Sequence, residues 1–460
     1  MNKDRMEIMS SIFYPRSVAV VGAGDEPDRV GFSQFESVLM AGFTGKVYPV
    51  HPRLETILGY KVYRSISEIP DRIDLVIIGV NQFASLEVIE ECGKLGIKGA
   101  VCIAGGYREF GNEGTALEEQ LVALARKHGM GIVGPNTLGI INTDAALNAT
   151  FYPMRLSQGK ASFICQSGGI GLTLIHKAID EGLNINKYVA VGNRSVLDIA
   201  DYLEYFAEDE GTSVIGLFVE GTENAGKLAR LAGDVSHIKP VVLYKAGRSD
   251  KLNYASVSHT GSMVGSYQMY RDIFNQFGVL VVDNALEMVA ACKALAVAPP
   301  ARGNRVGIVT HTAGPSIGLM DQIAHRGCDV PPLAEDTINW IKEEYGKKLT
   351  VVIKNPMDAG GLGMQQVPFG KLCNAVINDP NMDIMVSIFC LHRYWRFPSP
   401  EVVAAMRQSG KPLVALYISN LEGYRQEQSY LHSNGIPVYS TPEEAAWGVA
   451  ALAYFSKNNL

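Results

Sequence analysis

The sequence predicts an α/β protein with one Rossmann-like domain followed by two flavodoxin-like domains. Three observations support this prediction: short apolar strands alternate with helical patterns, the first strands end at Gly, Pro or Asn, and the second half contains an internal repeat. With 460 residues, of which 47% are hydrophobic and 19% charged, the chain is long enough for about three domains with buried cores. We place these domains at residues 1–145, 146–300 and 301–460.

The first domain contains five apolar strands separated by roughly 15 to 30 residues. They are VAVVGA, KVYPV, DLVIIGV, GAVCIAG and MGIVGP. This spacing leaves room for a crossover helix after each strand, which predicts a parallel sheet. Because most of the strands run into Gly, Pro or Asn, the carboxyl edge of the sheet lets a ligand approach the backbone closely.

The second and third domains repeat one pattern. ASFICQSGGIGLTLIHKAIDEG in the second corresponds to RVGIVTHTAGPSIGLMDQIAHRG in the third, and VIGLFVEG corresponds to IMVSIFCLH. The two copies differ where chemistry is expected. In the second domain the middle strand ends at Glu220 and a later loop contains His259, whereas the third domain has Cys390 or Leu391 at the strand end and no matching His-Thr-Gly-Ser. We therefore expect the chemistry to lie in the second domain.

The composition argues against several classes of function. A net charge of −6 gives no basic surface for a nucleic-acid backbone. The seven cysteines are scattered without a Cys-x-x-Cys pair, so we expect buried thiols in a reducing compartment. No cluster has metal-ligand spacing, and no GxxxxGK[ST] motif is present. The N-terminal residues lack the apolar core of a signal peptide, and no apolar run reaches the ~18 residues of a membrane helix, so we expect a cytoplasmic protein without a membrane partner.

A glycine-rich turn follows the first strand. Gly22, Ala23 and Gly24, with Gly31 before a helix, would let phosphate oxygens approach backbone N–H groups at the helix start. The same pattern also serves NAD, FAD or an ordinary tight turn.

The end of the second strand helps to separate these ligands. It has His51, Pro52 and Arg53 instead of the acidic residue that holds the ribose 2′-hydroxyl of NAD, which weakens the NAD interpretation. Lys46 and Arg53 flank this strand and would suit a ligand with an additional phosphate. The alternative is a glycine turn beside two solvated cations.

In the second domain, Gln166, Ser167, Gly168 and Gly169 follow an apolar strand and open a helix. Successive N–H groups at this helix start, together with the Ser167 hydroxyl, would form an anion site. An ordinary N-cap serine on a closely packed helix is the alternative, and this motif alone does not decide between them.

His259 lies among small residues in SHTGSM, where a ring nitrogen can be exposed. Neutral imidazole is a good nucleophile near pH 7 and can accept a phosphoryl group. Glu220 ends a neighbouring strand of the same domain, and a carboxylate bonded to one ring nitrogen would fix the tautomer and stabilise a phosphorylated ring. A loop histidine without a role is the alternative.

These motifs resemble the α subunit of ADP-forming acetyl-CoA synthetase, a relative of the succinyl-CoA synthetase α subunit. The resemblance covers essentially the whole chain, through SIFYPRSVAVVGAG, GKVYPVHPR, IVGPNTLGIIN, FICQSGGIG, VAVGNRSVLDIADYLEY, VVLYKAGRS and SHTGS. It implies that His259 is phosphorylated, that Glu220 steadies it, and that the helix start at Gln166 to Gly169 holds phosphate. It also implies a CoA site on the first domain, at Gly22, Ala23, Gly24, Gly31, Lys46, Pro52, Arg53, Val80, Gly134, Pro135 and Asn136.

The resemblance further implies a reversible reaction in which an acid, CoA and ATP give an acyl-CoA, ADP and phosphate through an acyl phosphate and phospho-His259. No segment after the third domain looks like an ATP-grasp domain, so it implies a separate β chain that binds ADP or ATP with Mg²⁺, in an α2β2 assembly. The substrate would be a small carboxylic acid whose identity stays open. Phe151 and Tyr152 are candidates for its pocket.

Two other functions stay open from the sequence. A CoA-binding regulatory protein of the same fold would have lost turnover, although the presence of both His259 and Glu220 argues against this loss. An NAD-dependent dehydrogenase rests only on the N-terminal glycine pattern.

Overall fold

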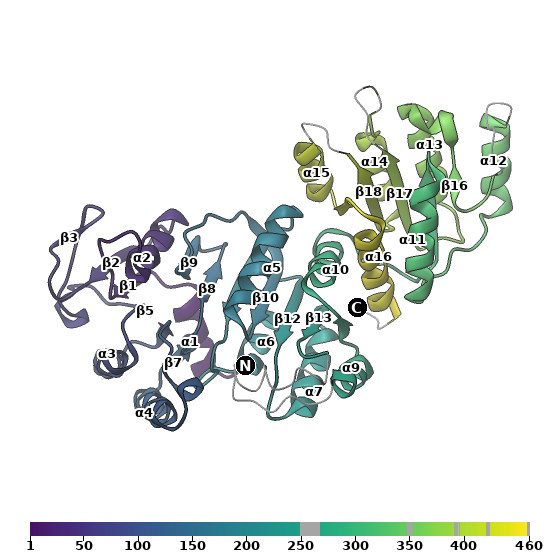
Figure 1. The fold of residues 1–460 in the computed structure, drawn as a ribbon. Helices are drawn as coiled ribbons and strands as arrows, with labels where there is room; N and C mark the ends of the chain where they lie inside the picture. Colours follow the sequence, from purple (N-terminus) through teal and green to yellow (C-terminus); the bar gives the residue numbers. More distant parts are fainter. Residues whose placement is uncertain (249–266, 347–352, 391–393, 395, 420–423, 458–460) are drawn as a thin grey trace. The chain divides into compact units, whose positions relative to one another are not determined.

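The computed structural model describes residues 1–460 except 249–266, 347–352, 391–393, 395, 420–423 and 458–460. The described residues form two compact units. The first unit comprises residues 1–176, 184–236 and 243–283, and contains the first sheet and nearly all of the second. The second unit comprises residues 177–183, 237–242 and 284–460, and contains the third sheet (Figure 1).

The first sheet has five parallel strands in the order β2-β1-β5-β6-β7. Its strands are β1 (Ser17–Val21), β2 (Lys46–Val50), β5 (Leu75–Ile78), β6 (Gly99–Cys102) and β7 (Gly131–Val133), with a small hairpin of β3 (Thr56–Ile57) and β4 (Tyr60–Lys61). The helices are α1 (Lys3–Phe13), α2 (Val30–Met40), α3 (Gln82–Lys94) and α4 (Asn112–His128), with 3-10 turns η1 (Ile66–Glu68) and η2 (Arg108–Phe110). All five predicted strands are present, and β1, β5, β6 and β7 are buried throughout because helices pack on both faces, whereas the edge strand β2 is buried only at its last two residues.

The second sheet has the order β14-β13-β12-β10-β11-β8-β9. Its strands are β8 (Gly139–Asn142), β9 (Leu147–Thr150), β10 (Gln158–Cys165), β11 (Ile185–Ala190), β12 (Val214–Val219), β13 (Val241–Lys245) and β14 (Leu280–Val282). The helices that follow them are α5 (Gly168–Asp180), α6 (Ile199–Glu208), α7 (Ala225–Ser236), α9 (Tyr267–Gln276) and α10 (Ala285–Val297). The five predicted strands, β10 to β14, lie in the flavodoxin-like order.

The hairpin of β8 and β9 crosses the domain limit that we placed between residues 145 and 146. The two strands pair with each other in antiparallel fashion, and β8 pairs with the edge strand β11 of the second sheet. The hairpin therefore extends the second sheet, although the glycine turn that precedes it follows the last strand of the first sheet.

The third sheet repeats the strand order of the second in five parallel strands, β16-β15-β17-β18-β19. Its strands are β15 (Val306–Thr310), β16 (Met357–Asp358), β17 (Ile384–Cys390), β18 (Leu413–Ile418) and β19 (Val438–Tyr439). The helices are α11 (Ala313–His325), α12 (Glu335–Tyr345), α13 (Gln366–Ile377), α14 (Ser399–Ser409), α15 (Tyr424–Ser433) and α16 (Pro442–Lys457), with a 3-10 turn η4 (Gly360–Met364). The internal repeat thus corresponds to two copies of one topology.

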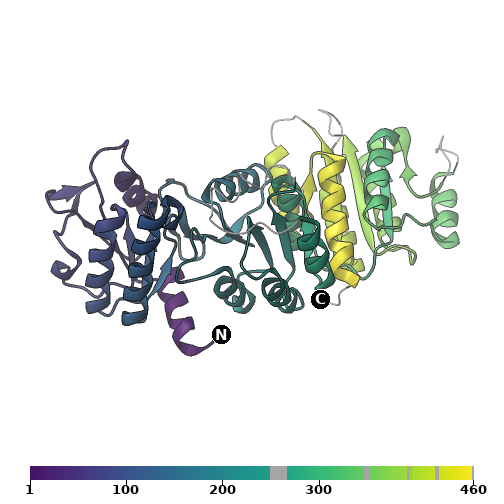
Figure 2. The ribbon, with the colours of Figure 1, turned by 60° about the horizontal axis from the view of Figure 1, so that its bottom comes forward.

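Helix α10, which we assigned to the second domain, packs in the second compact unit. Figure 2 shows it beside the long helix α16, drawn in yellow. Small side chains on both helices, including Ala290, Ala294 and Ala446, are buried in one cluster with the third sheet. Small residues allow two helices to approach closely, so the composition of α10 explains this packing.

In each sheet the strand order reverses between the first and third strands of the parallel five-strand unit, counted without the β8–β9 hairpin of the second sheet. In open α/β sheets, ligands bind in the crevice at this point, outside the carboxyl ends of the strands. The three positions are β1 with β5, β10 with β12, and β15 with β17.

Candidate active site

The switch point of the second sheet brings Gln166 next to Glu220. Strands β10 and β12 pair in register with Cys165 opposite Phe218, so the residues that follow them lie close together. The buried Gln166 side chain accepts hydrogen bonds at Oε1 from the backbone N–H groups of Glu220, at 2.9 Å, and Gly221, at 3.2 Å. The two elements predicted to carry chemistry are therefore joined directly.

Helix α5 begins at this same point. Ser167 Oγ lies 3.5 Å from the backbone nitrogen of Ile170, which is a long N-cap contact. A Cβ on Gly168 would come within 3.0 Å of Leu138, whereas one on Gly169 would meet nothing closer than 3.9 Å. Gly168 is therefore tightly packed, and Gly169 leaves open space above the helix start, where backbone N–H groups can meet an anion.

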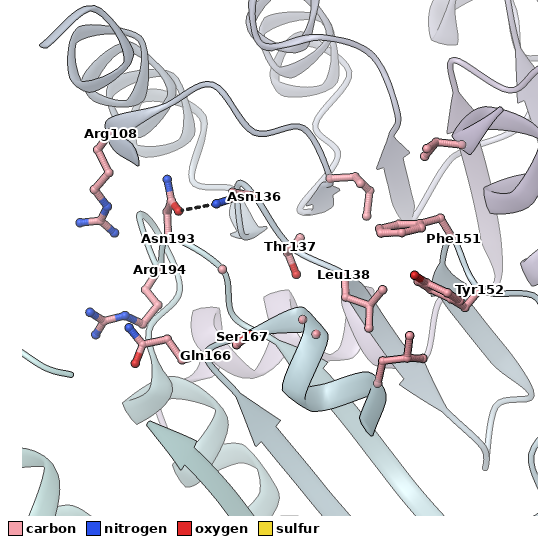
Figure 3. Close-up of a pocket in the computed structure, with 16 residues that line it drawn as sticks. Arg108, Asn136, Thr137, Leu138, Phe151, Tyr152, Gln166, Ser167, Asn193 and Arg194 are labelled. Carbon is pink, nitrogen blue, oxygen red and sulfur yellow. Dashed lines mark hydrogen bonds between the residues drawn. The ribbon is translucent and has the colours of Figure 1, made fainter. Parts of the chain in front are cut away.

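A cavity of about 420 Å³ opens above this helix start and lies within the first compact unit. Figure 3 shows its two ends: polar side chains gather around Arg108, Asn193, Arg194 and Gln166, and apolar side chains around Leu138, Phe151 and Tyr152. The cavity is lined by Val30, Ile103, Arg108, Asn136, Thr137, Leu138, Phe151, Tyr152, Gln166, Ser167, Gly168, Gly169, Leu172, Gly192, Asn193 and Arg194. A ligand with an anionic group and an apolar group matches this arrangement.

The predicted turn at Gly134, Pro135 and Asn136 forms another wall of the cavity. Asn136 Nδ2 donates to Asn193 Oδ1 at 3.3 Å, and the backbone N–H of Asn193 donates to the carbonyl of Pro135 at 2.9 Å. A Cβ on Gly192 would lie 2.3 Å from the Pro135 oxygen, so only glycine fits there. This turn therefore connects the end of the first sheet to the loop after β11 in the second.

The glycine turn after β1 lies at the switch point of the first sheet. Gly22 has a φ of +86°, and a Cβ on it would lie 2.9 Å from the Val80 side chain, beyond the end of β5. A Cβ on Gly31 would lie 2.0 Å from the Gly22 oxygen, which explains why helix α2 carries glycine in its first turn. The predicted residues Gly22, Gly31 and Val80 are thus brought together.

The residues around β2 are divided between its two ends. Arg53 and Pro52 follow the carboxyl end of β2, where the Arg53 backbone N–H donates to His51 Nδ1 at 3.2 Å. Lys46 begins the strand, on the opposite edge of the sheet, and its ammonium lies 2.8 Å from Asp71. Hydrogen bonds from Lys46 and Tyr48 lower the pKa of Asp71. Lys46 is therefore separated from the other predicted CoA residues, because a parallel strand points only one end at the ligand edge.

His259 lies outside the described residues. What the structure does describe is the strand that precedes it: β13 ends at Lys245, a buried lysine whose ammonium donates to the carbonyl oxygen of Glu220 at 2.8 Å and also to that of Ala246. Burial lowers the pKa of Lys245 to about 8. Lys245 thus ties the ends of β12 and β13 together behind Glu220, itself 9% exposed.

Sequence reasoning missed Lys245, Arg108, Asn193 and Arg194. Two signals in the sequence point to three of these residues: the lysine at the end of an apolar strand, in VVLYKAGR, indicates Lys245, and the polar pair after β11, in VAVGNRS, indicates Asn193 and Arg194. Among the described residues, no group of three or more His, Cys, Asp or Glu side chains could hold a metal ion. No helix in the described part of the chain has the length and apolar character needed to cross a membrane.

Comparisons with known proteins support the predicted fold and family. Residues 16–143 match the family described as CoA binding domain, and residues 158–295 match the succinyl-CoA ligase like flavodoxin domain. The α subunit of acetate–CoA ligase [ADP-forming] II from Pyrococcus furiosus is 37% identical over 98% of both chains. An acetate–CoA ligase [ADP-forming] I from Archaeoglobus fulgidus is 34% identical over 98% of this chain but 64% of its own length.

A solved structure shows the same architecture over the whole chain. It is the Ca. Korarchaeum cryptofilum dinucleotide forming acetyl-coenzyme A synthetase 1, in complex with phosphate and ADP, with 32% identity, a TM-score of 0.88, and coverage of 99% of this chain and 98% of that one. This likeness confirms the predicted fold class, and with the matches above it shows that the chain belongs to the family of ADP-forming acetate–CoA ligase α subunits.

Proposed function

We propose that this chain is the CoA-binding subunit of an ADP-forming acyl-CoA synthetase and carries phosphate on His259. The observation that carries the proposal is the junction of Gln166 with the Glu220 strand end, beside the start of α5. The junction places a helix N-terminus suited to an anion next to a buried carboxylate suited to a phosphorylated imidazole.

In this proposal phosphate attacks the thioester carbonyl of an acyl-CoA, and the thiolate of CoA leaves. A nitrogen of His259 then attacks the phosphorus of the acyl phosphate, and the carboxylate leaves. An oxygen of the β-phosphate of ADP finally attacks the phosphorus on His259, which forms ATP and releases the imidazole. The chain contributes the N–H groups of Ser167 to Gly169, which would donate hydrogen bonds to the phosphoryl oxygens. It also contributes Glu220, which offsets the positive charge of the phosphorylated imidazole.

The CoA site follows the switch point of the first sheet, at Gly22, Ala23, Gly24, Gly31 and Val80, with Pro52 and Arg53 nearby and the turn from Gly134 to Asn136 on the cavity wall. The glycine contacts support this placement, because a Cβ at Gly22 or Gly31 would collide with Val80 or with the Gly22 oxygen, so glycine lets the turn after β1 pack closely against the start of α2. The domain limits of 1–145, 146–300 and 301–460 belong to the same proposal.

The proposal includes a partner. The relatives from Pyrococcus furiosus are named as α subunits, and the Archaeoglobus fulgidus ligase is longer than this chain. Both facts support a separate β subunit, of ATP-grasp type and in an α2β2 assembly, that supplies the site for ADP or ATP and Mg²⁺. The apolar end of the cavity, at Leu138, Phe151 and Tyr152, would face the acyl group of a small carboxylic acid.

The direct test is to mix the purified chain with this β subunit, ADP, phosphate and an acyl-CoA. We expect ATP and free CoA to form, and we expect acid-labile phosphate on the chain when ADP is left out. The His259→Ala variant should give neither ATP nor labelled chain. Full ATP synthesis by this variant would remove His259 from the proposal, and CoA binding without turnover by the wild type would leave only a CoA-binding protein.

A further inference from the structure

Arg194 stands in the loop after β11 with an uncommon backbone conformation. Its φ is +59°, in the left-handed region that residues other than glycine, asparagine and aspartate seldom occupy. The loop is held there by backbone hydrogen bonds on both sides, from Asn193 N–H to Pro135 O at 2.9 Å and from Ser195 N–H to Gly134 O at 3.3 Å. Conformations of this kind persist where the surrounding structure fixes them, and they concentrate at functional sites.

The guanidinium of Arg194 is buried but only partly paired. Its side chain is 9% exposed, and Nη1 donates to Asp198 Oδ1 at 3.1 Å. Nε is buried without a hydrogen-bond partner among the described residues. A guanidinium that bonds one carboxylate through Nη1 keeps its other edge, Nε with Nη2, for a group with two oxygens.

Arg194 lines the same cavity as the start of α5. Figure 3 shows its side chain next to Gln166, at the polar end of the cavity, with Arg108 nearby. Arg108 is paired with Glu118 at 3.1 Å, and Glu118 also accepts from Asn193 and Ser195. The carboxylate of Glu118 is thus already engaged by Arg108, Asn193 and Ser195.

Arg194 also borders a second cavity, of about 280 Å³. That cavity is lined by Asp198, Glu223, Asn224 and Lys227 among others. In the second cavity, the carboxylates of Asp198 and Glu223 offset most of the charge of Arg108, Arg194 and Lys227, whereas the residues that line the first cavity include two arginines and no carboxylate. The first cavity is therefore the better location for a group that bonds Nε.

We propose that Arg194 binds the phosphoryl group that occupies the start of α5, through the edge formed by Nε and Nη2. This inference rests on the proposed function and adds a binding residue to it. Inorganic phosphate and the phosphoryl group of an acyl phosphate share this chemistry. Arg194 would then neutralise the oxyanion while Glu220 acts on the histidine side.

The test uses the full chain and inorganic phosphate, with the dissociation constant measured by calorimetry for wild type, Arg194→Gln and Arg194→Lys. The Arg194→Gln variant should bind phosphate about tenfold or more weakly than wild type. The Arg194→Lys variant keeps the charge but not the two-point geometry, so its dissociation constant should lie between those of wild type and Arg194→Gln. In the reaction with the β subunit, the KM for phosphate should rise by a similar factor. Circular dichroism checks that each variant is folded. If Arg194→Gln does not fold, the dissociation constant of Arg194→Lys is compared with that of wild type instead.

The matched control is Lys227→Gln, because Lys227 lines only the second cavity. It should leave phosphate binding unchanged. The inference is overturned if wild type binds no phosphate, if Arg194→Gln keeps its affinity within about twofold, or if Lys227→Gln causes the loss instead. The proposed function fails separately: His259→Ala should bind phosphate normally, and a wild type that binds phosphate through Arg194 but forms no ATP would refute the function alone.

Discussion

The second and third sheets have the same hydrogen-bonded junction between two strand ends, made by different side chains. In both, the residue after the first strand accepts a hydrogen bond from the backbone at the end of the third strand. Gln166 Oε1 accepts from Glu220 N–H, and His311 Nε2 accepts from Cys390 N–H, each at 2.9 Å. The fold therefore requires an acceptor after the first strand but no carboxylate after the third. The presence of Glu220 in one copy alone indicates chemistry.

The surroundings of the two junctions also differ. The ring of His311 packs edge-on against Phe389 at 4.8 Å, and a Cβ on Gly363 would lie 2.6 Å from the His311 Cβ, so the turn η4 covers the third-sheet junction. Burial lowers the pKa of His311. The second-sheet junction instead opens to the cavity of about 420 Å³. A buried neutral imidazole that accepts a backbone bond serves packing, which separates His311 from the role proposed for His259.

Among the variants at the two junctions, Glu220→Gln should cause the largest loss of activity. The amide keeps the size of the side chain but cannot offset the charge of a phosphorylated imidazole, so we expect kcat for ATP synthesis to fall by at least about 100-fold. Acid-labile phosphate on the chain should fall as well, which a filter assay with labelled phosphate measures. Cys390→Ser, at the equivalent position, should keep activity within about twofold. Equal losses in both variants would show that the two junctions do not differ in function.

A reciprocal exchange sharpens the comparison at the first strand. In Gln166→His the ring can accept from one N–H group, so the second bond, from Gly221, is lost at a cost of about 1 to 2 kcal/mol. Movement of the Glu220 strand end should lower kcat about tenfold. His311→Gln should lower the free energy of unfolding by a similar amount and leave kcat unchanged. Urea unfolding and steady-state rates measure the two effects, and a loss of kcat in His311→Gln would contradict the assignment.

Much of this site follows from the sequence, because the repeat determines the topology and the topology determines which strand ends meet. Once β10 and β12 are the first and third strands of a flavodoxin-like sheet, Gln166 and Glu220 must lie at one switch point. The position of Lys46 can also be predicted from the sequence, because a residue that begins a parallel strand does not lie at the carboxyl edge of the sheet. The charge of Lys46 suits a phosphate, but the direction of β2 leaves only the residues after Val50 at the ligand edge.

Other features depend on tertiary contacts that a linear pattern does not contain. The left-handed backbone of Arg194 is held by carbonyl groups of Gly134 and Pro135, nearly sixty residues earlier in the chain. The packing of α10 with α16 depends on the fit of two alanine-rich faces, which the pattern of either helix alone does not specify. Local propensity identifies such helices correctly but does not determine their neighbours.

The apolar end of the cavity gives a smaller expected effect. If Phe151 and Tyr152 face the acyl group, then Tyr152→Ala should raise the KM for bulky apolar acids by about tenfold and change the KM for acetate much less. Initial rates with acids of increasing size and saturating CoA measure this dependence. An equal loss for all acids, with a higher KM for CoA, would assign these rings to the CoA thiol arm instead.

The stability of the chain should depend on the protonation of His432, which lies beside the third sheet, whereas the reaction at neutral pH should not depend on it. His432 donates from Nδ1 to Gly182 O at 3.1 Å and accepts at Nε2 from Val438 N–H at 3.0 Å, an arrangement that requires the neutral ring. Burial, with the nearby Lys293 ammonium, lowers the pKa of His432 to about 4, although Glu181 acts in the opposite direction. Between about pH 4 and 6.5 the unfolded chain therefore binds more protons than the folded one, so the free energy of unfolding should fall as the pH is lowered through this window, by up to about 3 kcal/mol. His432→Gln removes the proton site, so the difference in stability between wild type and variant should shrink as the pH falls from 7 to 4, while kcat at pH 7 stays within about twofold. A difference that is constant over this range would show that His432 titrates alike in the folded and unfolded chains.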